Sequence, residues 1–124
     1  MYVYAAIAIG GVCGCWSRYL MTQLVQGIWG TWFPYATLVI NVSGSFLMGF
    51  LFIETLERLT LPVPVRTGIL TGFLGGYTTF STYMMESLLL MEQGAFLRSG
   101  VYLILSNLIG LAAAFFGAFL ARNL

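Results

Sequence analysis

Four apolar stretches, joined by short connections, occupy almost all of this 124-residue sequence. They cover residues 2–23, 33–53, 66–91 and 95–121. Each is long enough to cross a bilayer as a helix, which takes about 20 mostly apolar residues. Since a backbone that crosses lipid must satisfy its own hydrogen bonds, such stretches form helices. The sequence therefore predicts an all-α membrane protein, with one transmembrane domain of four spans over residues 1–124.

Charged residues are few, at 7% of the chain, and histidine, aspartate and lysine are absent. A Ser-His-Asp or Cys-His relay therefore has no base, and an intramembrane aspartyl pair has no aspartates. Cys13 and Cys15 lie two residues apart, so they face different directions on a helix and do not make a metal site. We therefore do not expect an enzyme. No positive side chain precedes Arg18, so we expect the first stretch to be retained as a span rather than removed as a signal peptide.

Arginines are distributed almost evenly between the two sides that four spans define. Arg58, Arg66 and Arg122 fall on one side. The other side has Arg98, together with Arg18 if its side chain snorkels. Because Lys and Arg near helix ends set orientation, three against two is a weak bias. Either a boundary is misplaced by a turn, or the chain inserts both ways and pairs as a dual-topology antiparallel homodimer. Four helices, each about 10 Å across, also leave little interior for a solute path, which favours an oligomer.

One face of the second stretch carries an amide, hydroxyls and a gap. At helical spacing this face consists of Thr37, Asn41, Gly44, Ser45 and Met48. Asn41 either makes a hydrogen bond between helices, worth about 0.6 to 2 kcal/mol, or lines a pore. The residues of this stretch alone favour neither interpretation. In the fourth stretch, the hydroxyls of Tyr102 and Ser106 likewise face either a partner helix or a channel.

The third stretch contains the most polar segment of the spans, TGFLGGYTTFSTY at residues 71–83. Gly75 and Gly76 are adjacent, and a glycine costs about 1 kcal/mol in a helix interior. The threonines that follow also weaken a regular helix. We therefore predict a break near residues 75–79. At this depth, freed backbone is tolerated only where it is buried in protein, binds something or lines water. Its carbonyls are able to hold a cation and its amides an anion.

After the predicted break, polar side chains continue along one helical face. Thr79, Thr82, Tyr83 and Glu86 share this face, and Phe80 lies three residues before Tyr83. The positive edges of the aromatic rings add to the hydroxyl donors that an anion would need in place of water. None of these donors is a fixed cation, so binding would be weak enough for release, as a fast pore requires. Glu86 near a mouth keeps a cation path as an alternative.

Several segments resemble the Fluc (CrcB) family of fluoride channels, in the family's order and over essentially the whole chain. They are GCWSRY at 14–19, INVSGSF at 40–46, RTGILTGF at 66–73 and GFLGGYTTFSTY at 72–83. The resemblance implies a dual-topology antiparallel homodimer of four-helix subunits with a break in the third helix. It also implies two fluoride pores that passively export fluoride from the bacterial cytoplasm across the cell inner membrane.

The resemblance also implies particular site residues. A structural sodium ion, which is not transported, would be held on the dimer axis by the backbone carbonyls of Gly75 and Thr78. The two pore phenylalanines fall on Phe80 and on position 83, where this chain has Tyr83 instead. The Tyr83 hydroxyl would hold the ion, admit water or obstruct the path. With the donors named above, the expected fluoride path comprises Asn41, Thr79, Phe80, Ser81, Thr82, Tyr83, Glu86, Tyr102 and Ser106.

Two alternatives remain from the residues. A proton-coupled exporter of the small multidrug resistance type has similar length and topology, but it needs a carboxylate in the middle of the first span. That stretch has none, so Glu86 would have to take the role. A non-conducting assembly subunit is the second alternative, and the polar line of the third stretch argues against it. The lining by itself indicates only a small, weakly held anion, and fluoride comes from the resemblance.

Overall fold

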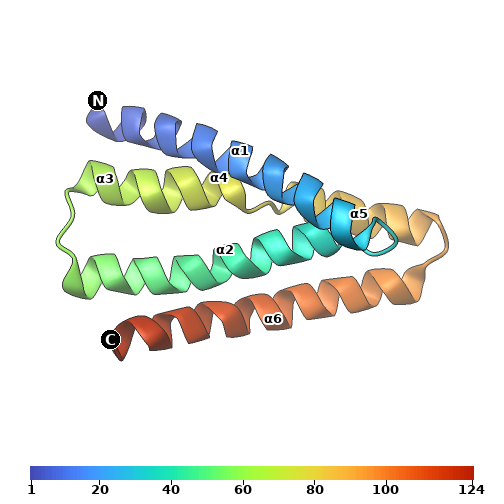
Figure 1. The fold of residues 1–124 in the computed structure, drawn as a ribbon. Helices are drawn as coiled ribbons and strands as arrows, with labels where there is room; N and C mark the ends of the chain where they lie inside the picture. The colour runs from blue at the N-terminus through green and yellow to red at the C-terminus, as the bar shows by residue number, and fades with distance from the viewer.

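The computed structural model describes residues 1–124 and consists of helices without a β-strand. Its elements in chain order are α1 (Tyr2–Trp29), α2 (Tyr35–Ile53), η1 (Glu54–Arg58), α3 (Val63–Thr67), η2 (Gly68–Leu74), α4 (Gly75–Tyr77), α5 (Ser81–Glu92) and α6 (Phe96–Arg122). The two η elements are π-helical and continue α2 and α3 directly. The long helices run roughly along one direction, and both termini lie at the same end of the molecule (Figure 1).

Three helices are long and apolar enough to cross a membrane, namely Tyr2–Trp29, Tyr35–Arg58 and Phe96–Arg122. The stretch expected as the third span instead forms two helical pieces, residues 63–77 and 81–92, so the chain still runs four times along the bundle. Large apolar side chains cover the outside, and Leu111 and Phe115 on α6 are 73% and 75% exposed. Because water would not solvate such a surface, it indicates a lipid environment.

Glycines allow two pairs of helices to approach backbone to backbone. Gly10 and Gly14 of α1 lie against the carbonyls of Gly68 and Phe73 in η2, leaving no room for a Cβ atom. Gly49 of α2 lies in the same way against α6. Small residues at helix interfaces have this role in lipid, where close packing rather than the hydrophobic effect drives association. The glycines of the first stretch therefore have a packing role.

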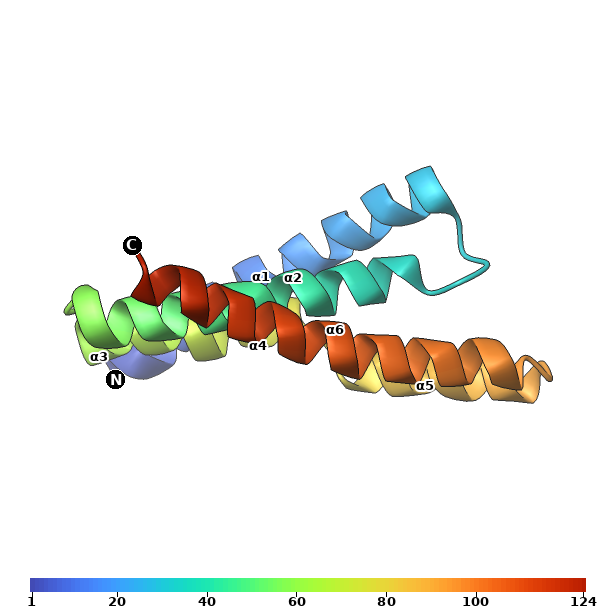
Figure 2. The ribbon, with the colours of Figure 1, turned by 90° about the horizontal axis from the view of Figure 1, so that it is seen from below.

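The break lies slightly later in the chain than the glycines that predicted it. Gly75 and Gly76 are helical, and the interruption covers residues 78–80, where Thr78 adopts an extended conformation with ψ 161°. A Cβ on Gly76 would lie 2.8 Å from the carbonyl oxygen of Gly11. Close packing on α1 therefore explains Gly76, while the chain leaves the helix only at the threonines. Figure 2 shows the consequence, because α5 lies along α6 while α1 diverges from α6 toward the α1–α2 connection.

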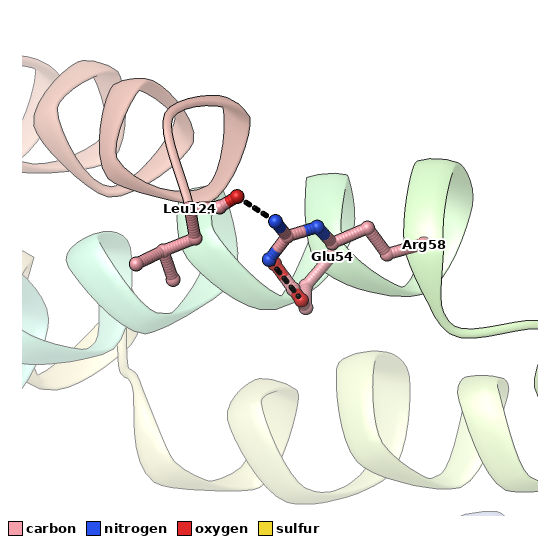
Figure 3. A network of polar contacts seen from close by, with 3 residues as sticks. All are labelled: Glu54, Arg58 and Leu124. Carbon is pink, nitrogen blue, oxygen red and sulfur yellow. Dashed lines mark hydrogen bonds and ion pairs between the residues drawn. The ribbon is translucent and has the colours of Figure 1, made fainter.

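Charged residues gather where the helices end. At the end with the termini, the Arg58 guanidinium donates to the Glu54 carboxylate at 3.3 Å and to the backbone carbonyl of Leu124 (Figure 3). Arg122 pairs with Glu57 at 3.6 Å. The arginines of both pairs are exposed, and surface pairs of this kind contribute about 0 to 1 kcal/mol each. Their main effect is to hold the end of α6 beside η1.

Two arginines stack on aromatic rings at opposite ends of the bundle. Arg66 lies 4.7 Å from the ring centre of Phe52, and Arg98 lies 4.4 Å from that of Trp32. Arginine and tryptophan at these positions are typical of membrane interfaces. Arg18 lies at neither end, since it donates to the backbone of the break. Arg58, Arg66 and Arg122 thus lie at the opposite end from Arg98, and the bilayer orientation of the chain stays a prediction.

The two kinds of glycine environment in α1 give a direct test of the packing. Gly14 faces the backbone of Phe73, whereas a Cβ on Gly27 would meet nothing within 4 Å. We expect Gly14→Ala to lower the free energy of unfolding by about 1 to 3 kcal/mol, because overpacking displaces backbone. Gly27→Ala should be neutral or stabilising by up to about 1 kcal/mol from helix propensity. Thermal unfolding in detergent measures both, and equal effects would contradict the backbone contact.

Candidate functional site

Asn41 of α2 pairs with the backbone of the break. Its side-chain oxygen accepts the Thr79 N–H at 2.8 Å, and its amide nitrogen donates to the Thr79 carbonyl at 2.9 Å. The single amide thus replaces both helical partners that Thr79 lacks. Of the two interpretations of Asn41, the hydrogen bond between helices is present, and the side chain also lines a cavity.

Other contacts complete the hydrogen bonding of the break. The Thr78 hydroxyl donates to the Leu74 carbonyl at 2.9 Å, and the Thr82 N–H donates to the Thr79 hydroxyl at 3.2 Å at the start of α5. Arg18 of α1 donates to the Thr78 carbonyl across a longer distance of 3.4 Å. Because lipid supplies no partners, this pairing is what allows an interruption at this depth.

Two polar cavities adjoin at the break, and Thr79 lines both. The first, which we call the α1 cavity, has a volume of about 390 Å³. Its polar lining consists of Cys15, Arg18, Tyr19, Thr22, Gln23, Gln26, Thr37, Thr79, Thr82 and Glu86. The second, the α6 cavity, has a volume of about 370 Å³ and no charged side chain. Its lining consists of Asn41, Gly44, Ser45, Met48, Leu74, Thr78, Thr79, Phe80, Tyr83, Ser106, Asn107 and Ala114.

The structure distributes the expected path residues unevenly. The α6 cavity collects Asn41, Thr79, Phe80, Tyr83 and Ser106, and the α1 cavity collects Thr79, Thr82 and Glu86. Ser81 is exposed at the start of α5 and lines neither cavity. Tyr102 is fully buried, lines neither cavity and donates its hydroxyl to the Glu86 carboxylate at 2.9 Å. It therefore acts on the α1 cavity through Glu86.

Ser106 lines a cavity with its hydroxyl unpaired, and Gly75 has empty space where a Cβ would stand. The Ser106 hydroxyl is buried in the α6 cavity without a hydrogen-bond partner, so its donor is free. A Cβ on Gly75 would meet nothing within 4 Å. Gly75 therefore leaves the backbone accessible one helical turn before Thr78.

Aromatic rings form a ladder that starts at the break. Phe80 and Tyr83 meet edge to face with centres 6.0 Å apart, and Tyr83 meets Tyr102 in the same way at 5.1 Å. Tyr102 then meets Phe33 at 5.5 Å. Edge-to-face contact is favoured because the ring edge is positive and the face negative. Phe80 is 71% exposed in the subunit, whereas Tyr83 is buried.

Sequence reasoning missed a polar stripe on α1 and one residue of α6. Arg18, Thr22 and Gln26 recur at steps of four, so helical spacing would have found this wall of the α1 cavity. Asn107 follows Ser106 directly on α6. In the structure its amide donates to the Tyr83 hydroxyl at 2.8 Å, a contact that no local spacing indicates.

The helices, the broken pass and its cavities define a multi-pass helical membrane protein. Comparison with known families is consistent with this class. Residues 5–118 match the family model described as CrcB-like protein, Camphor Resistance (CrcB). The chain belongs to this CrcB-like family.

Curated relatives of the chain carry the name fluoride-specific ion channel FluC. The relative from Acidithiobacillus ferrooxidans is 49% identical over 97% of this chain and 96% of its own length. That from Legionella pneumophila is 42% identical over 96% of this chain and 89% of its own. That from Geobacter metallireducens is 41% identical over the full length of both. These relatives are named as channels, in agreement with the expectation that the chain is not an enzyme.

Removing the Asn41 amide tests how the break is held. We expect Asn41→Ala to lower the free energy of unfolding by about 2 kcal/mol or more, because a buried N–H and a carbonyl lose their partners. Ser45→Ala is the matched control, since Ser45 lines the same cavity on the same helix. Thermal unfolding in detergent compares the two variants. Similar midpoints would mean that the break does not depend on Asn41.

Proposed function

We propose that this protein is a fluoride-selective passive ion channel in the inner membrane of a bacterium. It lowers the fluoride concentration of the cytoplasm. The observation that carries the proposal is the broken third pass, where two polar cavities adjoin at Thr79. Membership of the CrcB-like family and the names of the relatives support fluoride as the ion.

The α1 cavity provides an entrance for an anion. Arg18 lines it, and a cation in a narrow cavity raises the local concentration of anions. Thr82 adds a hydroxyl donor to the same wall. Glu86 lies in the same cavity and accepts a hydrogen bond from the Tyr102 hydroxyl, which weakens the repulsion between its carboxylate and an anion. The cavity is therefore polar enough for water to accompany an ion to the break.

The α6 cavity takes over part of the hydration of the ion. Asn41 has two N–H donors and uses one for the Thr79 carbonyl, so the other is available. The unpartnered Ser106 hydroxyl is a further donor, and the edge of Phe80 is weakly positive. Because this cavity has no charged side chain, the ion is held weakly and released quickly. Fluoride, small and a strong hydrogen-bond acceptor, gains more from such donors than chloride does.

The proposed channel is a homodimer of two antiparallel copies of the chain, with two pores per dimer. Ser81 and Thr82 are exposed in the subunit although they lie partway along the third pass. Lipid does not hydrogen-bond to hydroxyls or ions, so these polar groups need cover. Because Arg18 lies at neither end, the ends hold three arginines against one, so the antiparallel orientation is proposed from the family resemblance and not from this count.

A structural sodium ion fits the backbone oxygens near the break. The chain has no group of three His, Cys, Asp or Glu side chains that could hold a metal. Carbonyl oxygens are the ligands that hard cations prefer. The Thr78 carbonyl receives one long hydrogen bond from Arg18, which leaves its second lone pair free, and Gly75 borders open space. The ion would fix the break rather than cross the membrane.

Flux from liposomes tests the channel. The reconstituted protein should release fluoride without a proton gradient and retain chloride. Phe80→Ile should lower fluoride flux about tenfold, equal to ~1.4 kcal/mol of barrier, because a ring edge is lost from the cavity. Phe115→Ile is the control, since Phe115 is equally exposed on α6 and lines neither cavity. Flux that required a proton gradient would instead indicate an exporter, for which α1 lacks the necessary carboxylate.

Sodium removal tests the cation. Exchange of sodium for N-methylglucamine during purification should lower both the unfolding temperature and the fluoride flux. An ion at 100 times its dissociation constant stabilises the folded state by about 2.7 kcal/mol, so the loss is measurable. Chloride salts at equal ionic strength keep screening constant. Unchanged stability and flux would rule out a functional sodium ion.

A further inference from the structure

The Tyr83 hydroxyl is bound by two groups of α6. It donates to the Leu103 carbonyl at 3.0 Å and accepts from the Asn107 amide at 2.8 Å. The same amide nitrogen also donates to the Leu103 carbonyl at 2.8 Å. The three groups thus close a triangle, which uses the only phenol proton and both amide protons.

This triangle fixes a ring at the centre of the proposed path. Tyr83 is 6% exposed and lines the α6 cavity with Phe80 and Ser106. To bind an anion, its hydroxyl would have to give up its hydrogen bond to the Leu103 carbonyl. The Ser106 hydroxyl in the same cavity is free and would bind an anion at no such cost.

We propose that Asn107 is a positioning residue, which holds the Tyr83 hydroxyl on α6 and so keeps it from binding the conducted ion. This inference rests on the proposed channel function. Without the amide, the phenol oxygen loses its donor and only the bond from the hydroxyl to the Leu103 carbonyl is left, so the hydroxyl turns more readily into the α6 cavity. There it adds a donor that holds the ion longer. Asn107 is therefore needed only because position 83 is tyrosine.

A set of four proteins tests this dependence by fluoride flux from liposomes: the unmodified chain, Tyr83→Phe, Asn107→Leu and the double variant. Tyr83→Phe, in which Asn107 keeps the Leu103 carbonyl as its partner, gives the reference flux of a path without the hydroxyl. Asn107→Leu should lower flux about tenfold through tighter retention of the ion. Adding Tyr83→Phe to Asn107→Leu should raise flux above that of Asn107→Leu, to within about threefold of Tyr83→Phe alone, because no hydroxyl remains to be freed.

Rescue separates positioning from a general packing role. Tyr77→Phe added to Asn107→Leu is the matched control, because Tyr77 bonds to Ser43 and not to α6. This control should not restore flux. The proposal is overturned if Tyr83→Phe alone slows flux as much as Asn107→Leu, since the hydroxyl would then be an ion ligand. It is also overturned if the double variant stays slow, or if Tyr77→Phe rescues equally.

Thermal unfolding in detergent tests the contact between Asn107 and Tyr83 independently of flux. Asn107→Leu should lower the unfolding midpoint of the unmodified chain more than that of Tyr83→Phe, and additive effects would exclude the pairing. Asn107→Ala replaces Asn107→Leu if the leucine prevents folding. Absence of fluoride flux from the unmodified chain would refute the channel. Non-additive midpoints would then still support the hold on Tyr83, and additive midpoints would overturn it.

Discussion

The pairing of Asn41 with both backbone groups of Thr79 is the interaction on which the arrangement of the third pass depends. A peptide group in lipid without partners costs several kcal/mol, so an interruption forms only where another element supplies a donor and an acceptor. A side-chain amide has the geometry for this exchange, since its oxygen and nitrogen face the peptide N–H and C=O together. The break is thus a property of α2 and the third pass together.

The interruption allows one pass to pack by two different means. Before the break, η2 and α4 meet α1 through glycines, with backbones in contact. After it, α5 meets α6 through side-chain hydrogen bonds, including the bond from the Ser99 hydroxyl to the Ser87 carbonyl at 2.9 Å. A straight helix would present one continuous face to one neighbour. The change of neighbour at residues 78–80 creates the space on both sides of Thr79.

The number of passes followed from the lengths of the apolar stretches, because lipid leaves helices as the available structure. The break followed from GGYTT, although Gly76 turned out to serve contact with α1 and the interruption falls on the threonines. The partners of Asn41 and Asn107 could not be predicted, since they depend on how helices distant in sequence align. The polar stripe on α1, formed by Arg18, Thr22 and Gln26, could have been predicted, because its spacing is local to one helix.

Satisfying the break leaves few free donors beside it, and this scarcity bears on how an ion would be held. The Thr79 N–H, one Asn41 proton and the Tyr83 hydroxyl all have protein partners. What remains in the α6 cavity is the second Asn41 proton, the Ser106 hydroxyl and weakly positive ring edges. A full shell of donors would bind an anion tightly and slow its departure. A partial shell of donors without a fixed charge instead favours passage. It admits only ions that can replace their lost hydration with these few donors.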